Sequence, residues 1–306
     1  AAHTLQHVLD DWNFISPQLQ DLYVELNHGK GRHVFPFDPA MCMAPLPRAY
    51  QCVRAAAYAS PSDGLAQAEW PVHGTAGLVA PDLMQLGSDA LQGPSDEFVW
   101  TDEALQLDFE AGWAALTSDI PAGCTPARAL AGVRLLALCN TWVLRSLADA
   151  ERLATVGSVQ SRPAVAFSPV VVTPDEVGAA WSQGRLHLML QTLWNGRRVG
   201  RTDAGAAMTL HMGQLLAQAA AHRPLHAGSV VCTGPVSSSR EGDGAATKWP
   251  DGYHSIQSKR AMEVLQTRQA ATGFLASGDT VRMDMTGPDG LSVFGAIDQT
   301  VLTAPD

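Results

Sequence analysis

The sequence has few basic residues and no long apolar run, and each absence excludes a class of partner. Its 306 residues include 20 Lys and Arg against 30 Asp and Glu, which gives a formal net charge of -10. Binding to nucleic acid requires clustered Lys and Arg, so we expect no nucleic acid partner. No apolar run reaches the roughly 18 residues that cross a membrane. We therefore expect no membrane partner either.

Cysteines are also few, and their spacing argues against two further kinds of site. The five are odd in number, widely spaced and include no CxxC pair: Cys42, Cys52, Cys124, Cys139 and Cys232. This pattern indicates reduced, mostly buried thiols, and not a disulfide framework or a zinc site. The first residues show no basic segment followed by an apolar run, which a secretion signal would need. We expect a cytoplasmic protein.

The composition and the first residues suggest how the chain is divided. A hydrophobic content of 46% with 16% charged residues is typical of a globular protein with a large core. Apolar residues recur every three or four positions in residues 4–27, which predicts helices, with Pro17 beginning the second. Four prolines in residues 36–47 mark an extended connector. We predict an N-terminal helical extension, residues 1–45, followed by a main domain, residues 46–306.

One predicted strand carries acidic side chains in an otherwise apolar stretch, residues 107–116. Alternation along a strand places Asp108, Glu110 and Gly112 on one face and the aromatic side chains on the other. Burying an acidic face is costly unless the carboxylates bind a metal ion or a paired charge. This face is therefore the candidate functional site.

The rest of the chain alternates predicted strands, turns and short helices. We predict helices over residues 125–134, 173–181 and 208–221, and strands over residues 164–173, 186–193, 229–233, 279–285 and 292–301. Thr125 is a plausible N-cap, and Asn195–Gly196 predicts a hairpin turn. Residues 237–251 are polar and rich in glycine, which predicts a loop of the kind that covers a site.

Four segments carry a resemblance to a known family. They read APLPRAYQC (44–52), AFSPVVVTPDEVGAAW (166–181), WNGRRVGRTDAGAAMTLHMGQLLAQAA (194–220) and GDTVRMDMTGPDGLSVFGAIDQTV (278–301). In order and spacing they resemble the fumarylacetoacetate hydrolase (FAH) family, and specifically its bacterial members with an N-terminal extension. The resemblance implies an α+β, β-rich fold, a mixed β-sandwich roll with peripheral helices and a small N-terminal helical segment. It also implies a homodimer.

The resemblance implies a chemistry as well. Family enzymes hydrolyse acylpyruvates and other 1,3-diketo acids, decarboxylate oxaloacetate, or isomerise related keto acids, as in aromatic catabolism. A divalent cation, Mg²⁺ or Mn²⁺, polarises the keto-enol oxygens of the substrate. The family holds this cation with a strand of the form E-x-E and with the Asp of a later N-D-x-x-x-R motif.

This chain departs from the metal-binding motifs. Glu110 stands where the first Glu of E-x-E belongs, but Gly112 replaces the second. Asn140 and Arg145 match the later motif, but Thr141 replaces its Asp. One expected carboxylate remains, which predicts a degenerate metal site and at most weak binding of Mg²⁺ or Mn²⁺. If the alignment is right, the changes Gly112→Glu and Thr141→Asp should restore metal binding.

Other positions at which the family places functional residues also differ. Pro61 lies near the place of a proton-transferring His, and Arg162 takes the place of a substrate-contacting Lys. Pro235 replaces a Thr in an anion-contacting loop, and Ser258 takes the position of a Glu. Because so many changes fall at site positions, the resemblance predicts an intact scaffold with an atypical site.

Five residues remain as candidates for a catalytic or binding role. Glu110 is expected to be a partly buried carboxylate paired with Arg145. Arg145 and Arg162 could together bind a carboxylate of a small keto acid. His254, beside Tyr253 in a predicted loop, is the better of two histidine candidates for proton transfer.

Three hypotheses follow. In the first, the chain has lost the metal and the family reaction and binds a small keto acid or carboxylate, alone or paired with an active paralogue. In the second, it is an active hydrolase, decarboxylase or isomerase of a 2-keto acid, with no metal or with one displaced onto Asp108 and Glu110. In the third, it is a structural partner whose cleft is filled by side chains such as Trp113 and Trp142.

Overall fold

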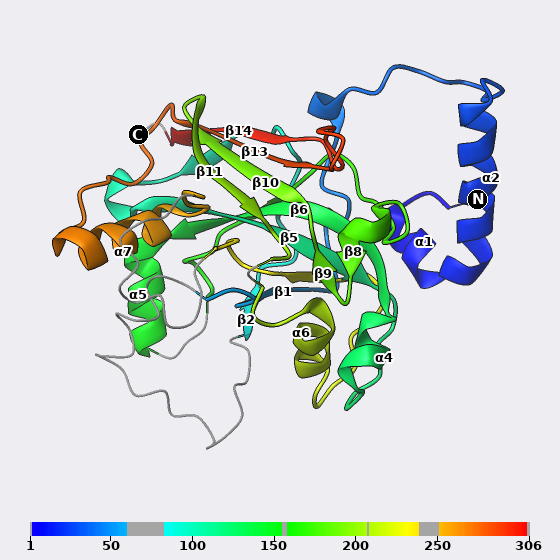
Figure 1. Ribbon diagram of the computed structural model, residues 1–306, viewed down its shortest axis with the longest axis horizontal. Coiled ribbons are helices and arrows are strands. Elements are labelled where there is room, and N and C mark those ends of the chain that lie inside the picture. The colour runs from blue at the N-terminus through cyan, green and yellow to red at the C-terminus, as the bar shows by residue number, and fades with distance from the viewer. Residues whose placement is uncertain (1, 60–82, 155–157, 207, 239–250, 305–306) are drawn as a thin grey trace.

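The computed structural model (Figure 1) describes residues 2–59, 83–154, 158–206, 208–238 and 251–304. Its architecture is β-rich, with helices at the periphery of two packed sheets, and this confirms the predicted α+β fold. Within the described residues, no helix is both long enough and apolar enough to cross a bilayer.

Seven strands form the larger, mixed sheet. In spatial order they are β2 (Leu83–Leu86), β1 (Gln51–Ala55), β12 (Ser229–Cys232), β5 (Leu107–Thr117), β6 (Val133–Leu144), β7 (Val165–Phe167) and β3 (Leu91–Gln92). Strand β1 runs parallel to β12, and β12, β5, β6 and β7 follow one another antiparallel.

Five strands form the second sheet. In spatial order they are β11 (Arg197–Asp203), β10 (Met189–Trp194), β13 (Thr280–Thr286), β14 (Ile297–Thr303) and β4 (Phe98–Trp100). The predicted turn between β10 and β11 is confirmed, because Asn195 and Gly196 have φ angles of 51° and 72°, as a tight hairpin requires. A short ribbon of β8 (Trp181–Ser182) and β9 (Arg185–Leu186) lies apart.

The long pair β5–β6 links the core to the candidate site. Every residue of β5 is buried, and Glu110 lies opposite Thr141 in the antiparallel register. Phe109 and Trp113 belong to the core cluster shared with the second sheet, whereas Ala114 belongs to the cluster on the other face of β5. The predicted alternation is therefore confirmed.

The first N-terminal helix packs on the outer face of the larger sheet. Helix α1 (Leu5–Asp10) buries Leu9 there, together with Ala44 and Leu46 from the connector that contains the turn η1 (Pro39–Met41). Helix α2 (Trp12–Asn27) then runs along the edge of the molecule, at the right of Figure 1. The prediction that Pro17 begins a helix is wrong, because α2 starts at Trp12 and contains the proline.

Other helices are shorter than the sequence predicted. The remaining helical elements are η2 (Glu103–Leu105), α4 (Pro126–Leu130), α5 (Arg145–Ala154), η3 (Gly178–Ala180), α6 (Met212–Ala219) and α7 (Ile256–Thr267). Thr125 caps α4, accepting from the amide of Arg128 at 3.3 Å, as predicted. The helix predicted over 173–181 is wrong, since a turn and η3 occupy it before β8 begins. Most of the predicted loop 237–251, and Pro61, lie outside the described residues.

Candidate functional site

A cavity of about 190 Å³ lies beside the acidic face of β5. Arg54 of β1, Glu110 of β5 and Arg145 at the start of α5 supply its charged lining. The loop after β12 adds Thr233, and the segment that begins α7 adds Ser258. Positions far apart in the sequence therefore meet around one cavity. Because this cavity exists beside Glu110, the hypothesis of a cleft filled by Trp113 and Trp142 is wrong, and both rings lie in the core between the sheets.

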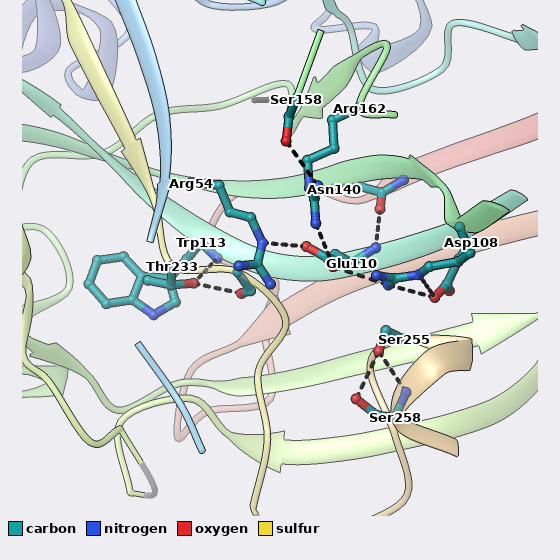
Figure 2. A network of polar contacts seen from close by, with 12 residues as sticks. Arg54, Asp108, Glu110, Trp113, Asn140, Ser158, Arg162, Thr233, Ser255 and Ser258 are labelled. Atoms are coloured by element: carbon teal, nitrogen blue, oxygen red, sulfur yellow. Dashed lines mark hydrogen bonds and ion pairs between the residues drawn. The ribbon is translucent and has the colours of Figure 1, made fainter. Parts of the chain in front are cut away.

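Three arginines surround the buried carboxylate of Glu110, and Figure 2 labels two of them, Arg54 and Arg162. Arg54 Nε donates to Glu110 Oε2 at 2.6 Å, and Arg145 Nη2 donates to Oε1 at 3.0 Å. Arg162, in the segment between α5 and β7, brings Nη2 to 3.9 Å from Oε1. The Glu110 side chain is 2% exposed. The predicted pair of Glu110 and Arg145 is confirmed, and Arg54 is a partner that the sequence did not reveal.

The arginines determine the protonation state of Glu110. Burial raises the pKa of this carboxyl, but the positive charges of Arg54, Arg145 and Arg162 and the hydrogen bond from Arg54 outweigh burial and lower the pKa to about 2. Glu110 is therefore a carboxylate at any pH near neutrality. It cannot act as a general acid there, because it carries no proton to donate.

Asp108, on the same face of β5, forms hydrogen bonds both to Arg145 and to the start of helix α7. Its carboxylate accepts from Arg145 Nε at 2.8 Å, and from the backbone amides of Ile256 and Gln257 at 2.7 and 2.9 Å. These amides belong to the first turn of α7, where a negative charge is favourable. Asp108 therefore orients Arg145 toward Glu110 and holds the start of α7 at the cavity.

Two glycines allow the charged groups to come this close. A Cβ on Gly112 would collide with the carbonyl oxygen of Gly234 and lie 2.8 Å from Thr233 Oγ1. Gly234 has a φ of 71°, and a Cβ there would lie 3.2 Å from the guanidinium carbon of Arg54. The loop after β12 therefore packs directly on β5, and Arg54 passes over it to reach Glu110.

Arg54 presents hydrogen-bond donors to the cavity. It belongs to a cluster in which three guanidiniums meet two carboxyl groups. Arg54 lines the cavity, its side chain is 13% exposed, and its Nε is held by Glu110. Among the described residues, its two terminal nitrogens have no hydrogen-bond acceptor. The cavity thus presents guanidinium N–H donors to an anion.

The remaining predicted residues lie elsewhere. His254 is 1% exposed, and its ring nitrogens lie 2.8 Å from Thr192 Oγ1 and 2.9 Å from Thr202 Oγ1. Burial lowers the pKa of its imidazole to about 3, so the ring is neutral. Neither His254 nor the half-buried Tyr253 is among the described residues that line the cavity. A role of either in proton transfer stays a prediction that this geometry does not favour.

Comparison with known proteins decides the family. The family model for the fumarylacetoacetate (FAA) hydrolase C-terminal region matches residues 52–302, and that for fumarylacetoacetase N-terminal domain 2 matches residues 1–48. The chain belongs to the fumarylacetoacetate hydrolase family. No curated protein matches the sequence.

Solved structures share the FAH fold at low sequence identity. A probable 2-hydroxyhepta-2,4-diene-1,7-dioate isomerase from Mycobacterium abscessus is 15% identical with a TM-score of 0.66, over 99% of this chain and 89% of that chain. The 5-carboxymethyl-2-hydroxymuconate delta-isomerase from Mycobacterium smegmatis is 17% identical with a TM-score of 0.57, over 87% of this chain and 83% of that chain.

The residues at the cavity do not fit the divalent cation of the FAH family. Both oxygens of Glu110 already accept from arginines, and Asp108 is occupied by Arg145 and the amides of α7. A cation placed between them would also face three guanidiniums. In the described part of the chain, no group of three or more His, Cys, Asp or Glu side chains is arranged to hold a metal ion. A metal displaced onto Asp108 and Glu110 is therefore not supported by this geometry.

The geometry does not favour our expectation that two substitutions would restore the FAH metal site, which stays a prediction. Gly112→Glu needs a Cβ where the backbone of Gly234 lies. Thr141 is 1% exposed on the neighbouring strand, so Thr141→Asp would place another charge in a closed environment. The backbone of Gly234 therefore lies where a glutamate at position 112 would need its Cβ, so that side chain does not fit without movement of the loop after β12.

Proposed function

We propose that the cavity binds a small carboxylate, of the 2-keto acid or 1,3-diketo acid class, without a divalent cation, and that the chain serves as a ligand-binding member of its family. The observation that carries this proposal is Arg54, which lines the cavity with its Nε held by Glu110 and with no acceptor for its terminal nitrogens among the described residues. A guanidinium fork matches a carboxylate in geometry as well as in charge.

The size and lining of the cavity support a ligand of a few carbon atoms. A volume of about 190 Å³ accommodates a short dicarboxylate but not a nucleotide or a long acyl chain. Ser255 and Ser258 also line it, and because their hydroxyls bond to each other at 2.8 Å, one hydroxyl proton remains for a keto or enol oxygen. The names of the two structural neighbours above describe isomerases of a dicarboxylate and of a carboxymethyl-substituted dicarboxylate, which agrees with a carboxylate ligand.

The proposal is tested by the thermal shift that oxalate and pyruvate produce in the presence of a chelator. We expect a rise in melting temperature that saturates with ligand concentration, because a ligand that binds only the folded state stabilises it. Arg54→Gln should abolish the rise. Arg128→Gln is the matched control, since Arg128 is exposed on α4 and is not among the residues that line the cavity. An equal shift in both variants would contradict the proposal.

An enzymatic role is the second candidate, because a cavity is present where positions that matter in the family come together. Glu110, Arg145, Pro235 and Ser258 all line it. In this case the chain would hydrolyse, decarboxylate or isomerise the keto acid with arginines stabilising the developing enolate. Turnover of oxaloacetate or an acylpyruvate in the presence of a chelator, lost in Arg145→Gln, would favour the enzyme over the binding protein.

A further inference from the structure

Gln257, the second residue of α7, lines the cavity with a side chain that is not engaged within the described part of the chain. Its backbone is held in place, because the amide N donates to Asp108 Oδ2 at 2.9 Å. Its side chain is partly buried and forms no hydrogen bond to another described residue. A carboxamide carries two N–H donors and a carbonyl acceptor. This neutral group is therefore available to a ligand in the cavity.

Several hydroxyl groups of the lining are already engaged with the protein itself. The Tyr58 hydroxyl donates to the carbonyl oxygen of Ala204 at 2.7 Å, and the Thr233 hydroxyl donates to that of Gly234 at 3.0 Å. Neither hydroxyl retains a proton for a ligand. The serine pair at the start of α7 retains one proton between its two hydroxyls. Gln257 therefore adds N–H donors that these hydroxyls do not provide.

Asp108 places Gln257 next to a guanidinium. The same oxygen that accepts from the Gln257 amide N, Asp108 Oδ2, lies 2.7 Å from Arg145 Nη2. Two donors that share one acceptor atom lie at most about 6 Å apart. Arg145 in turn shares the Glu110 carboxylate with Arg54, each of them donating to a different oxygen. Gln257 therefore lines the cavity on the side of its arginines.

This arrangement of donors suits a 2-keto acid. The keto oxygen of such a ligand is bound to the carbon next to the carboxylate, so the two groups require neighbouring donors. When the carboxylate lies on the guanidinium of Arg54 or Arg145, the keto oxygen meets a donor beside it. A keto oxygen only accepts hydrogen bonds, which matches the N–H groups of a carboxamide. A methylene group in the same place would leave that donor without an acceptor.

We propose that Gln257 is a specificity-determining residue: its side-chain N–H donates to the 2-keto oxygen of the ligand and selects 2-keto acids over carboxylic acids that lack this oxygen. This role rests on the proposed function, because it requires the ligand carboxylate on the arginines. Arg54 provides affinity for carboxylates in general, whereas Gln257 provides the preference among them.

A ratio of two affinities tests this role, because the contribution of the carboxylate cancels. Pyruvate and propionate differ only in the keto oxygen, and calorimetric titration in excess chelator gives both dissociation constants. Gln257→Met keeps the length of the side chain without its polar atoms. The ratio of the propionate to the pyruvate dissociation constant should therefore fall about fivefold, the effect of one neutral hydrogen bond. Gln269→Met, exposed beyond the end of α7 and outside the described lining, is the matched control and should leave the ratio unchanged.

Gln257→Glu tests the same contact in the opposite direction. A carboxylate only accepts hydrogen bonds, so it repels a keto oxygen but accepts from the 2-hydroxyl group of lactate. The ratio of the pyruvate to the lactate dissociation constant should rise at least about fivefold over that of wild type. This comparison decides the matter even if Gln257→Met fails to fold.

Two results would contradict the proposal in different ways. If each ratio stayed at its wild-type value in the Gln257 variants while all three ligands still bound, the role of Gln257 would be overturned and the proposed function would stand. If the wild-type protein bound none of the three ligands, the proposed function would be contradicted, and the role of Gln257 would fall with it.

Discussion

Replacing Glu110 with Gln separates the arginine-lined cavity from a metal site. Glutamine keeps the size of the side chain but removes its charge, so Glu110→Gln resembles the wild-type protein with Glu110 protonated. The three guanidiniums that now neutralise Glu110 would lose that partner. If Glu110 served chiefly to hold a cation, its removal should abolish ligand binding. If it serves to position arginines, ligand binding should survive.

The cost to stability follows from the pKa of Glu110. The pKa falls from 4.5 to about 2 in the folded state. Each unit corresponds to about 1.4 kcal/mol, so Glu110→Gln should lower the free energy of unfolding by about 3 kcal/mol at pH 7. Because the folded-state pKa is depressed, this contribution is complete above pH 4.5 and is lost as the pH falls toward 2. The difference in free energy of unfolding between wild type and variant should therefore be about 1 kcal/mol smaller at pH 4 than at pH 7.

Two assays check this prediction. Urea unfolding at pH 7 and pH 4 gives the stability difference and its pH dependence. Calorimetric titration with oxalate under native conditions gives the affinity, which we expect to be equal to or higher than that of wild type, because the cavity gains a further net positive charge. A folded Glu110→Gln protein that no longer binds oxalate would refute the role assigned to the arginines.

Three further predictions concern neighbouring groups. Gly112→Glu with Thr141→Asp should destabilise the protein without creating stoichiometric Mg²⁺ or Mn²⁺ binding, as equilibrium dialysis would show; a bound ion would contradict the close packing of Gly112. The free energy of unfolding of the wild-type protein should fall by about 2.5 kcal/mol between pH 6.5 and pH 4.5, because the depressed pKa of the buried His254 imidazole makes protonation favour unfolding. His254→Gln should remove this pH dependence. If urea unfolding gave the same pH profile for the variant, His254 would not be buried as a neutral ring. Asp108→Asn should speed amide exchange at the start of α7, because the amide NH2 that replaces one carboxylate oxygen cannot accept from the guanidinium or from the backbone amides that Asp108 now holds; exchange equal to wild type would rule out that anchor.

Local patterns predicted the parts of the molecule that neighbouring residues determine. The two faces of β5 followed from alternation, and the hairpin at Asn195 followed from a residue pair that readily adopts positive φ. Thr125 was found as a cap from its place before a proline. The helix predicted over 173–181 is wrong, because the polar residues at its start form a turn before β8 and do not cap a helix.

The site could be predicted only in part, because its partners come from distant segments. Glu110 and Arg145 were found through strand alternation and the resemblance, and the structure brings them together. Arg54 was missed, although a lone charge in an apolar strand was a usable signal. Its contact with Glu110 depends on β12 lying between β1 and β5, which no local spacing reveals. The contact of Asp108 with the amide of Ile256 joins segments 148 residues apart.

The central claim is that guanidiniums, and not a divalent cation, provide the positive charge of this cavity. The most direct measurement is a calorimetric titration of the wild-type protein with oxalate, first in excess chelator and then with added Mg²⁺ or Mn²⁺. We predict saturable binding of one oxalate per chain in chelator, with an affinity that the added cation does not raise. Binding that appears only when the cation is present would contradict the account.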